Sequence, residues 1–423
     1  MLSRICRTLR RLVSHLLHLR FSSFFRDLRA LFRRACDALC ALRQARRLRS
    51  ALSGRAAGKR VVVFPPTLDW HLPLYQRPQQ MARAYSEKRN TLVLYLTSNN
   101  GHDRVRAFER LSDSLILINA ALARELPALL SGAAEVVLSL SWTVNRRYLT
   151  ILRPDRVIYE YIDELEIFDG YGAAMRRDHR YLLQHADLTV CTASALYEKA
   201  REISRHAIYS PNACDYAFFS RTSSVAPAPE AAELTASFRF TLGYYGALAE
   251  WFDYSLLAAA ADARPDWLFL LVGMDYDGSL QNSGILEKKN IRWIPPQPYA
   301  RLREFLCLFD LALIPFVLND ITRSTSPVKL FEYMAAEKPI LCSRMNECRR
   351  YRSVALYDGL GDFLHKAEIL LAHRSDPAYR SLLRAEALEN TWEARTDEIL
   401  RTLDALPPPL VQGPVRIKKA VSE

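Results

Sequence analysis

The residues best suited to chemistry lie in one segment of the second half of the chain. A Ser/Thr-rich turn, residues 324–326, is followed by Pro327, a residue type favoured at the first position of a helix. The helix that this pattern predicts would begin with unpaired backbone N–H groups and a positive dipole end, which suit a diphosphate. Lys329 and Glu332 are three residues apart and share one face of this helix, so a cation near phosphates and a carboxylate near ribose hydroxyls could together hold a nucleotide. The alternative interpretation is an ion pair on the surface of an ordinary helix.

Strand-like and helix-like segments alternate through the body of the chain and would position these residues. The predicted strands are apolar runs at residues 61–64, 91–96, 115–118, 136–140, 157–161 and 188–191, and then at 240–243, 267–273, 291–294, 311–314 and 339–342. This alternation predicts an α/β protein with two doubly wound, Rossmann-like parallel sheets that face a cleft, with ligands bound at the carboxyl ends of the strands.

We expect six parts along the chain. They are a basic amphipathic helical arm (1–58), an N-terminal Rossmann-like domain (59–220), an Ala/Pro/Ser-rich linker (221–237), a C-terminal Rossmann-like domain (238–385), a helix that crosses back to the first domain (386–406) and a flexible tail (407–423). The amphipathic pattern behind the crossing helix extends without interruption over residues 378–405.

Motifs for other kinds of chemistry are weak or absent. The loop after the first strand, residues 64–67, contains no glycine, so it is neither a dinucleotide-binding loop nor a Walker A loop. Asp275 and Asp277 resemble an Asp-x-Asp metal pair, but they follow a predicted strand and precede Gly278, as a polar turn does. The eight cysteines lack the spacing of a zinc site and are too sparse for a disulfide scaffold. We therefore expect reduced thiols, no metal and no cofactor.

The formal net charge of +12 is unevenly distributed. Residues 1–60 contain 16 Lys and Arg against Asp27 and Asp37, whereas residues 61–423 carry 42 basic and 44 acidic side chains. The excess positive charge therefore belongs to the arm, and the nearly neutral body offers no basic groove for a nucleic acid.

The arm reads as an amphipathic helix over residues 2–47, with Leu and Phe at three- and four-residue spacing and Arg on the other sides. This pattern predicts that residues 1–50 bind an anionic membrane surface. Packing on the body, dimerisation, an organelle-targeting peptide and nucleic-acid binding are the alternatives. No apolar run is long enough to span a bilayer, and arginines recur where a secretory signal would be purely apolar.

A family resemblance rests on several segments in a fixed order. They are Trp70 with residues 76–80, residues 159–164, residues 186–189 with Ser194, residues 211–215, residues 243–248 with Trp251 and Asp253, residues 323–336 with 338–340, and residues 390–395. Together these segments, which span about residues 60–405, resemble the GT-B glycosyltransferases, particularly the family 4 (group 1) enzymes of bacterial polysaccharide and teichuronic acid synthesis.

The resemblance implies roles for a set of donor-binding residues. Glu332 would bind the ribose, Lys329 and the loop of Ser324, Thr325 and Ser326 would face the diphosphate, and Gly243 and Gly246 would let the backbone approach the donor. Two departures stand out. Ser324 occupies the place of the first carboxylate of the family's Glu-x7-Glu motif, and Ala249-Glu250-Trp251 stands where the family has Arg and Lys.

On the acceptor side we expect residues of the first domain. Asp163 and Glu164 follow a predicted strand directly and could meet acceptor hydroxyls or the donor sugar, or Asp163 could cap a helix. Trp70, His71 and Arg77 lie in or just after the first loop. For His71 an exposed loop histidine is the favoured interpretation, and Arg77 could belong to an ion pair. We assign Asp163, Glu164 and Lys329 as catalytic candidates.

The resulting hypothesis is a glycosyltransferase at the cytoplasmic face of the cell membrane. It would move a sugar from a nucleotide-diphosphate sugar to a hydroxyl of a saccharide or lipid-linked acceptor, without a metal because Lys329 and the helix start balance the departing diphosphate. The resemblance implies retention of anomeric configuration through front-face attack on an oxocarbenium-like sugar. A GT-B sugar-nucleotide epimerase and a non-catalytic membrane-associated GT-B scaffold are the alternatives.

Overall fold

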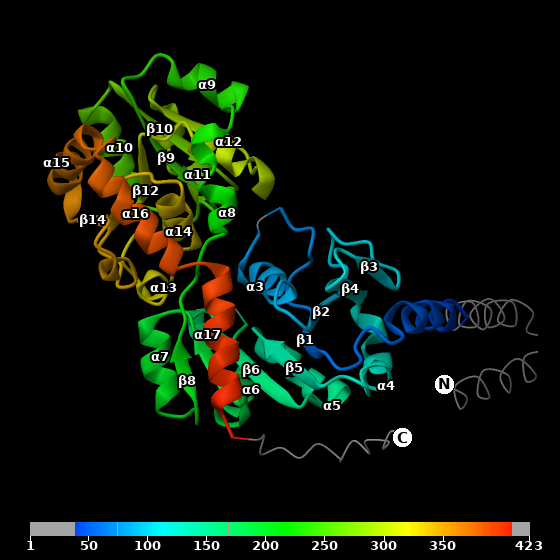
Figure 1. Ribbon diagram of the computed structural model, residues 1–423. Coiled ribbons are helices and arrows are strands. Elements are labelled where there is room, and N and C mark those ends of the chain that lie inside the picture. The colour runs from blue at the N-terminus through cyan, green and yellow to red at the C-terminus, as the bar shows by residue number, and fades with distance from the viewer. Residues whose placement is uncertain (1–38, 74, 168–169, 408–423) are drawn as a thin grey trace, which may run out of the picture.

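The computed structural model describes residues 39–73, 75–167 and 170–407, which form two α/β units, one built around each of two sheets (Figure 1). The eleven predicted strands are all present, and each begins and ends within two residues of its expected bounds. They could be predicted because a strand that is buried on both faces has a continuous run of apolar residues.

The first sheet has eight strands in the order β3-β4-β2-β1-β5-β6-β7-β8, and every neighbouring pair is parallel except β3 with β4. The strands are β1 (Arg60–Phe64), β2 (Thr91–Thr97), β3 (Phe108–Arg110), β4 (Leu115–Asn119), β5 (Glu135–Leu140), β6 (Arg156–Tyr161), β7 (Leu188–Cys191) and β8 (Ala207–Tyr209). The central strand β1 pairs Val62 with Val93 of β2 and with Val137 of β5.

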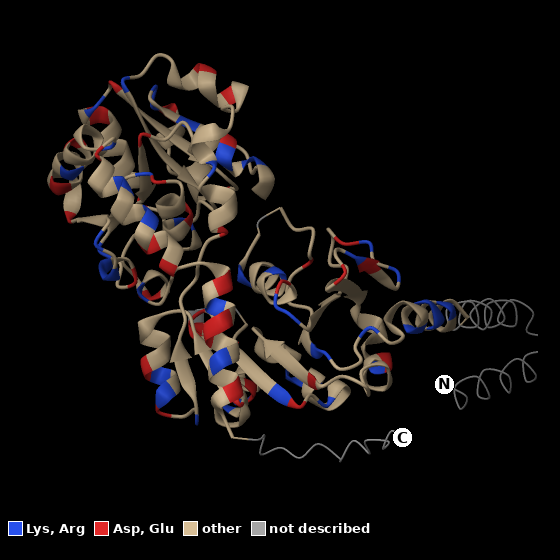
Figure 2. Cartoon of the chain, viewed as in Figure 1, with Lys and Arg blue, Asp and Glu red and all other residues tan. Residues whose placement is uncertain are grey.

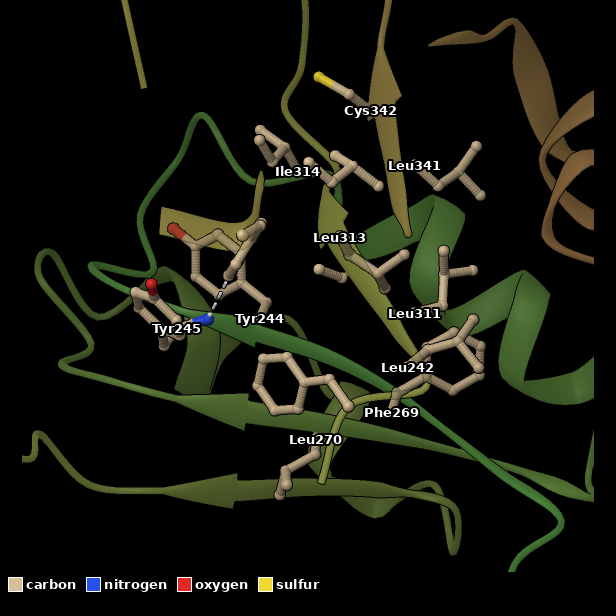
Figure 3. Close-up of a cluster of buried hydrophobic side chains, with 14 of the residues drawn as sticks. Leu242, Tyr244, Tyr245, Phe269, Leu270, Leu311, Leu313, Ile314, Leu341 and Cys342 are labelled. Atoms are coloured by element: carbon tan, nitrogen blue, oxygen red, sulfur yellow. Dashed lines mark hydrogen bonds between the residues drawn. The ribbon is translucent and has the colours of Figure 1, made fainter. Parts of the chain in front are cut away.

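The second sheet has six parallel strands in the order β11-β10-β9-β12-β13-β14. They are β9 (Phe240–Tyr245), β10 (Trp267–Val272), β11 (Ile291–Ile294), β12 (Leu311–Ile314), β13 (Ile340–Ser343) and β14 (Val354–Tyr357). Figure 3 shows part of the core on these strands, including Leu242, Phe269 and Leu313, which are fully buried.

Helices connect the parallel strands in both units. In the first unit they are α3 (Arg77–Ser86), α4 (Leu126–Leu129), α5 (Arg147–Leu152), α6 (Ala173–His185) and α7 (Ser194–Arg201), with 3₁₀ helices η1 (Ala120–Glu125), η2 (Thr143–Arg146) and η3 (Leu165–Ile167). In the second they are α8 (Tyr216–Phe219), α9 (Pro229–Thr235), α10 (Tyr254–Ala263), α11 (Ser279–Asn282), α12 (Leu302–Leu306), α13 (Asp320–Arg323), α14 (Val328–Ala335), α15 (Gly359–Ala372) and α16 (Pro377–Glu389), with η4 (Thr222–Ser224), η5 (Ile285–Glu287), η6 (Tyr299–Arg301) and η7 (Cys348–Arg350). The last helix, α17 (Trp392–Ala405), packs in the core of the first unit.

The C-terminal segment differs from the single helix predicted over residues 378–405. It breaks at Asn390, and Thr391 caps the new helix α17 by accepting a hydrogen bond from the Ala394 amide. Helix α17 packs along α3 of the first unit (Figure 1), so the chain does cross back. The apolar periodicity continues through the break, which is why the sequence pattern alone did not reveal it.

The predicted linker, residues 221–237, is partly helical and packs against the second unit. It contains η4 and α9, and the side chains of Ala228 and Ala231 are fully buried in the core of the second unit. The segment is therefore part of that unit's packing, and the exact domain boundaries remain a prediction.

The basic arm is described only from residue 39. Residues 39–52 are helical, and their Ala45, Leu48 and Leu52 are buried in the core of the first unit, whereas Leu39 and Leu42 are exposed. Figure 2 shows Lys and Arg gathered along this helix. The rest of the arm, residues 1–38, and nearly all of the predicted tail, residues 408–423, lie outside the described residues. Within the part of the chain that the structure describes, no helix is both long enough and apolar enough to cross a bilayer.

Candidate functional site

The helix predicted around Lys329 and Glu332 is α14. It begins at Val328, one residue later than expected, and Pro327 is its N-cap in an extended conformation. Its first backbone N–H groups have no partner within the helix, as at any helix start. Lys329 and Glu332 do not form the surface ion pair that was the alternative interpretation, because Glu332 is buried and no salt bridge joins the two among the described residues.

The ammonium of Lys329 is held against aromatic rings. Its Nζ lies 5.0 Å from the ring centroid of Tyr244 and 5.1 Å from that of Phe316, within the range of cation–π attraction. Within the described ranges the ammonium has no hydrogen-bond acceptor and no carboxylate partner. Burial lowers the pKa of Lys329 to about 8, although the charge of Glu332 favours the protonated form. A partly buried cation without an anionic partner suits an anionic ligand.

Gly246 makes room for this lysine. Its φ is +135°, and a Cβ at this position would lie 2.9 Å from Cε of Lys329. The following loop approaches equally closely, because a Cβ on Gly273, at φ +153°, would lie 1.8 Å from the carbonyl oxygen of Gly246. Gly246 therefore lies beside Lys329, its donor-binding role stays a prediction, and Gly273 is a neighbour that the sequence did not single out.

Gly243 has a different function from the one predicted. It lies inside β9, paired with Leu270 and Ala312, and a Cβ there would lie 2.1 Å from the ring of Phe309. The missing side chain leaves space for this buried ring. The structure thus gives Gly243 a role in core packing, not in the approach of the backbone to a donor.

Glu332 lies on the same helix with its carboxylate fixed. The hydroxyl of Tyr245 donates to Glu332 Oε2 at 2.7 Å, and the Tyr245 amide in turn donates to the Tyr333 hydroxyl at 3.2 Å. Figure 3 shows Tyr244 and Tyr245 with the core residues of β9 and its neighbours. Burial raises the pKa of Glu332 to about 7, and the Tyr245 hydrogen bond and the Lys329 charge oppose this rise.

The turn before α14, residues 324–326, is largely buried and forms hydrogen bonds with the segment that leaves the first unit. Ser324 and Ser326 are 5% exposed, and the Thr325 hydroxyl donates to the Ile321 carbonyl at 2.7 Å. The Asn212 side chain donates to the carbonyl of Ser326 at 2.7 Å, and the Asn212 amide donates to the Ser326 hydroxyl at 3.2 Å. The predicted phosphate-facing turn therefore also forms a contact between the two units.

Asp163 and Glu164 follow β6 as predicted, but their environments differ. Burial raises the pKa of Asp163 to about 7, and its carboxylate has no hydrogen-bond or ion-pair partner among the residues described. Glu164 accepts from the Tyr161 hydroxyl at 3.3 Å and is paired with Lys199 of α7. Asp163 is thus available to a ligand, whereas Glu164 is engaged in an ion pair.

The three acceptor-side candidates, Trp70, His71 and Arg77, also differ in exposure and in their partners. Trp70 is buried and packs edge-on against Tyr95, with ring centroids 5.1 Å apart. His71 is an exposed loop residue, 44% accessible, whose Nδ1 lies 2.8 Å from Asp103. Arg77 is 4% exposed and pairs with Glu160 of β6 at 2.7 Å. The structure therefore contradicts a substrate-facing position for Arg77, because its guanidinium is enclosed by protein.

Two buried aspartates that the sequence analysis did not single out organise the first loop. Asp69 accepts hydrogen bonds from the amides of Asn100, His102 and Asp103 and from the Thr97 hydroxyl. Burial opposes ionisation, but these donors outweigh it and hold the pKa of Asp69 below its usual value. Asp103 in turn accepts from the amides of Trp70 and His71. The polar run at residues 98–103 was the available signal, since such runs mark structured loops.

Asp275 and Asp277 form a polar turn, as expected. Asp275 accepts from the amides of Leu280 and Gln281, and Asp277 accepts from the amides of Glu250 and Ser279. Their carboxylates are occupied by backbone donors.

A second contact between the units was also missed. Glu347, in the loop after β13, is 2% exposed and accepts from the amide and hydroxyl of Ser194, at 2.7 and 2.6 Å, and from the hydroxyl of Tyr209. Its carboxylate therefore lies at the N-terminus of α7 in the other unit, where a negative charge is favoured. Nothing in the sequence around Glu347 identifies a partner 153 residues away.

Comparisons with known proteins agree with this architecture. No family model matches the chain. A Bacillus subtilis (strain 168) protein, TuaH, named as a teichuronic acid biosynthesis glycosyltransferase, is 24% identical over 230 residues, which are 52% of this chain and 57% of that protein. The match thus covers little more than half of the relative's length.

Solved structures match over most of the chain. The sucrose-phosphate synthase of Thermosynechococcus elongatus has a TM-score of 0.58 at 15% identity and covers 82% of this chain and 99% of its own. HepE of Anabaena, solved in complex with UDP-glucose, has a TM-score of 0.56 at 16% identity and covers 82% and 100%. The trehalose 6-phosphate synthase of Burkholderia multivorans has a TM-score of 0.59 at 12% identity and covers 82% and 98%. This chain therefore has the GT-B glycosyltransferase fold that its sequence motifs resemble.

Proposed function

We propose that this chain is a glycosyltransferase that moves a sugar from a nucleotide-diphosphate sugar to an acceptor hydroxyl. The observation that carries the proposal is Lys329, a partly buried ammonium that lies against two aromatic rings without an anionic partner among the described residues, one residue after the start of α14. A diphosphate supplies the missing negative charge, and the first amides of α14 supply hydrogen-bond donors for its oxygens.

The same groups would assist the bond-breaking step. The diphosphate gains negative charge as the bond from the sugar C1 to its oxygen breaks, and Lys329 and the helix start are already in place to stabilise it. Gly246 leaves the lysine room beside the backbone. This arrangement supplies positive charge from the protein itself, so the proposal requires no metal.

Glu332 would bind the nucleoside part of the donor. Its carboxylate is fixed by Tyr245 and lies one helical turn after Lys329, so ribose hydroxyls could donate to it while the diphosphate meets the lysine. HepE, which shares the fold, is described in complex with UDP and with UDP-glucose, and this supports a nucleotide-sugar donor for the present chain.

Asp163 is the strongest acceptor-side candidate. It lies just past the carboxyl end of β6, and its raised pKa allows it to exchange a proton with an acceptor hydroxyl near neutral pH. Retention of configuration, through front-face attack on an oxocarbenium-like sugar, is the outcome that the family resemblance supports. We assign Glu164 a supporting role, since Lys199 already neutralises it.

We further propose that the enzyme works at the cytoplasmic face of the cell membrane on a saccharide or lipid-linked acceptor. The sequence of the arm supports this location through its alternating apolar and arginine positions. In the described helix 39–52, Leu39 and Leu42 remain exposed beside Arg43 and Arg46, while Leu48 attaches the helix to the first unit.

Two experiments test the proposal. Calorimetry with UDP, followed by detection of UDP release from a panel of sugar nucleotides that begins with UDP-glucose, should show binding and turnover. Glu332→Gln and Lys329→Met should reduce both, and unchanged binding in both variants would show that the site is wrongly assigned. For the membrane, a chain lacking residues 1–38 keeps Leu48 and Leu52 and should lose sedimentation with phosphatidylglycerol vesicles while retaining UDP binding. Equal sedimentation would contradict the membrane role.

A further inference from the structure

A buried chain of hydrogen bonds connects the two units beside the candidate site. It begins at Glu160 on β6, which is 3% exposed and accepts from Nε of Arg77 at 2.7 Å. Nη1 of Arg77 donates to the carbonyl of Pro211 at 3.1 Å and lies 3.4 Å from Oδ1 of Asn212. One guanidinium thus joins a central strand of the first sheet to the segment that leaves this unit.

The chain continues into the second unit through Asn212. Its Nδ2 donates to the Ser326 carbonyl at 2.7 Å, and its amide donates to the Ser326 hydroxyl at 3.2 Å. Helix α17 encloses the connection, because Nε of Arg395 also donates to the Pro211 carbonyl, at 3.0 Å, and the guanidinium of Arg77 lies 5.8 Å from the Trp392 ring centroid. Arg77 and Glu160 are buried, and Asn212 is partly buried.

The two ends of this series of hydrogen bonds, Glu160 and Ser326, are close in sequence to the two unpaired charges of the candidate site. Glu160 precedes Asp163 by three residues at the end of β6, and Ser326 precedes Lys329 by three residues at the start of α14. The hydrogen bonds from Glu160 to Ser326 therefore connect the strand end that precedes Asp163 to the helix start that carries Lys329.

We propose that Arg77 and Asn212 are positioning residues, which hold the turn at residues 324–327 in register with β6. The inference rests on the proposed glycosyltransferase function and assigns these residues no contact with substrate. Donor-binding groups such as Lys329, Gly246 and Glu332 all belong to the second unit, so a shift between units leaves the donor bound but misaligns it with the acceptor side. A misplacement of about 1 Å can reduce a catalytic rate by about 100-fold.

Two conservative variants test the proposal. Arg77→Lys keeps a positive charge but cannot contact Glu160 and the Pro211 carbonyl at the same time, because a single ammonium nitrogen replaces the Nε and Nη1 donors of the guanidinium fork. Asn212→Asp keeps the acceptor for Arg77 and replaces the donor to the Ser326 carbonyl by a carboxylate oxygen.

Asn290→Asp is the matched control. Asn290 is also a buried amide, 7% exposed, and its Nδ2 donates to the carbonyls of Ala261, Arg264 and Trp267, all within the second unit. This control loses backbone hydrogen bonds of the same kind without touching the contact between the units.

The readouts separate positioning from stability. In Arg77→Lys and Asn212→Asp, kcat for UDP release from the sugar nucleotide that the wild type turns over should fall roughly 10- to 100-fold, while its KM and the Kd of UDP stay within about twofold. Amide hydrogen exchange over residues 324–330, measured on the full chain, should become faster. Asn290→Asp should lower the melting temperature and leave kcat, KM and the exchange of this segment unchanged.

Each outcome decides the inference. If the two variants change exchange and kcat no more than Asn290→Asp does, Arg77 and Asn212 are ordinary structural residues and the inference is wrong. The same holds if exchange rises while kcat stays constant. If the wild type releases no UDP from any sugar nucleotide, the proposed function fails. Unchanged exchange in the variants would then refute the positioning contact as well, whereas faster exchange would leave that contact standing without its catalytic role.

Discussion

Replacing Lys329 by methionine should affect stability and ligand binding in opposite directions. Methionine keeps the length and apolar contacts of the side chain against Tyr244 and Phe316 but carries no charge. Burial lowers the pKa of Lys329 from 10.5 to about 8, which at 1.36 kcal/mol per pKa unit means that charging it in the folded protein costs at most about 3–4 kcal/mol. The variant should therefore unfold with equal or higher free energy at pH 7.

The sign of the pH dependence follows from the same shift. The unfolded chain keeps the lysine proton up to about pH 10.5, whereas the folded protein releases it near pH 8. The cost of burying the cation is therefore complete below pH 8 and diminishes as the pH rises from 8 to 10.5. The free energy of unfolding of the wild type should rise over this interval relative to that of Lys329→Met.

Binding should show the opposite change. A charge-assisted hydrogen bond contributes about 1.5 to 3 kcal/mol, so the loss of the ammonium should weaken UDP binding by roughly 10- to 150-fold. Isothermal titration calorimetry gives the Kd, and titration at pH 8.5 in two buffers of different ionisation enthalpy should show proton uptake by the wild type that the variant lacks.

Lys338 provides the control for this experiment. It is partly buried in the same unit, but its Nζ donates to the carbonyls of Cys307 and Phe309 at 3.0 and 2.8 Å. Lys338→Met should lower the free energy of unfolding by about 1 to 3 kcal/mol, because two carbonyls lose their donor, and should leave the Kd of UDP unchanged. The reasoning would be refuted if Lys329→Met destabilised the protein as much as Lys338→Met, or if both bound UDP equally.

Three further predictions follow from individual contacts. Tyr245→Phe removes a hydrogen bond that lowers the pKa of Glu332, so this pKa should rise further and less carboxylate should be ionised at pH 7. UDP should then bind roughly 2- to 10-fold more weakly at pH 7, and the pH midpoint of binding should move upward. An identical curve of Kd against pH would contradict this prediction. The folded protein holds the Asp163 proton more tightly than the unfolded chain does, so this residue makes the free energy of unfolding fall as the pH rises from about 4 to 7. In urea unfolding at pH 5 and pH 7, the Asp163→Asn variant should show a smaller fall than the wild type. Equal falls would exclude a raised pKa for Asp163. Glu347→Gln weakens the contact with Ser194 and should lower the free energy of unfolding by about 1 to 3 kcal/mol, whereas an unchanged thermal transition would show that the contact contributes nothing to holding the units together.

Most of the fold could be predicted because parallel strands in this chain are continuous apolar runs. The strands that escaped prediction, β3, β8 and β14, have three or four residues each and lie at the edges of their sheets, where partial exposure removes the apolar signal. The break between α16 and α17 escaped for another reason, since the helical periodicity continues across Asn390 and only the cap at Thr391 marks the end.

The site could be predicted only as far as local spacing determines it. Residues three apart on a helix share a face, so Lys329 and Glu332 were placed together correctly. Spacing does not reveal which of two nearby glycines accommodates a core ring and which accommodates the lysine, because Phe309 and Lys329 reach Gly243 and Gly246 through the tertiary fold. The same limit explains Arg77, whose ion-pair partner Glu160 lies 83 residues away in sequence.

Lys329 and Lys338 show which physical property distinguishes a binding group from a structural one in this chain. Lys329 lies in α14 and Lys338 just after it, both are partly buried, and desolvation lowers the pKa of both. Two carbonyl acceptors offset the desolvation cost of Lys338, whereas among residues 39–73, 75–167 and 170–407 the Lys329 ammonium has only aromatic faces as partners, which stabilise a cation weakly. An uncompensated charge raises the free energy of the folded protein, and binding of an anion would lower it again. Asp163 meets the same criterion on the first unit, whereas Glu164, Glu347 and Arg77 do not, because each already has a partner of opposite charge or a set of hydrogen bonds.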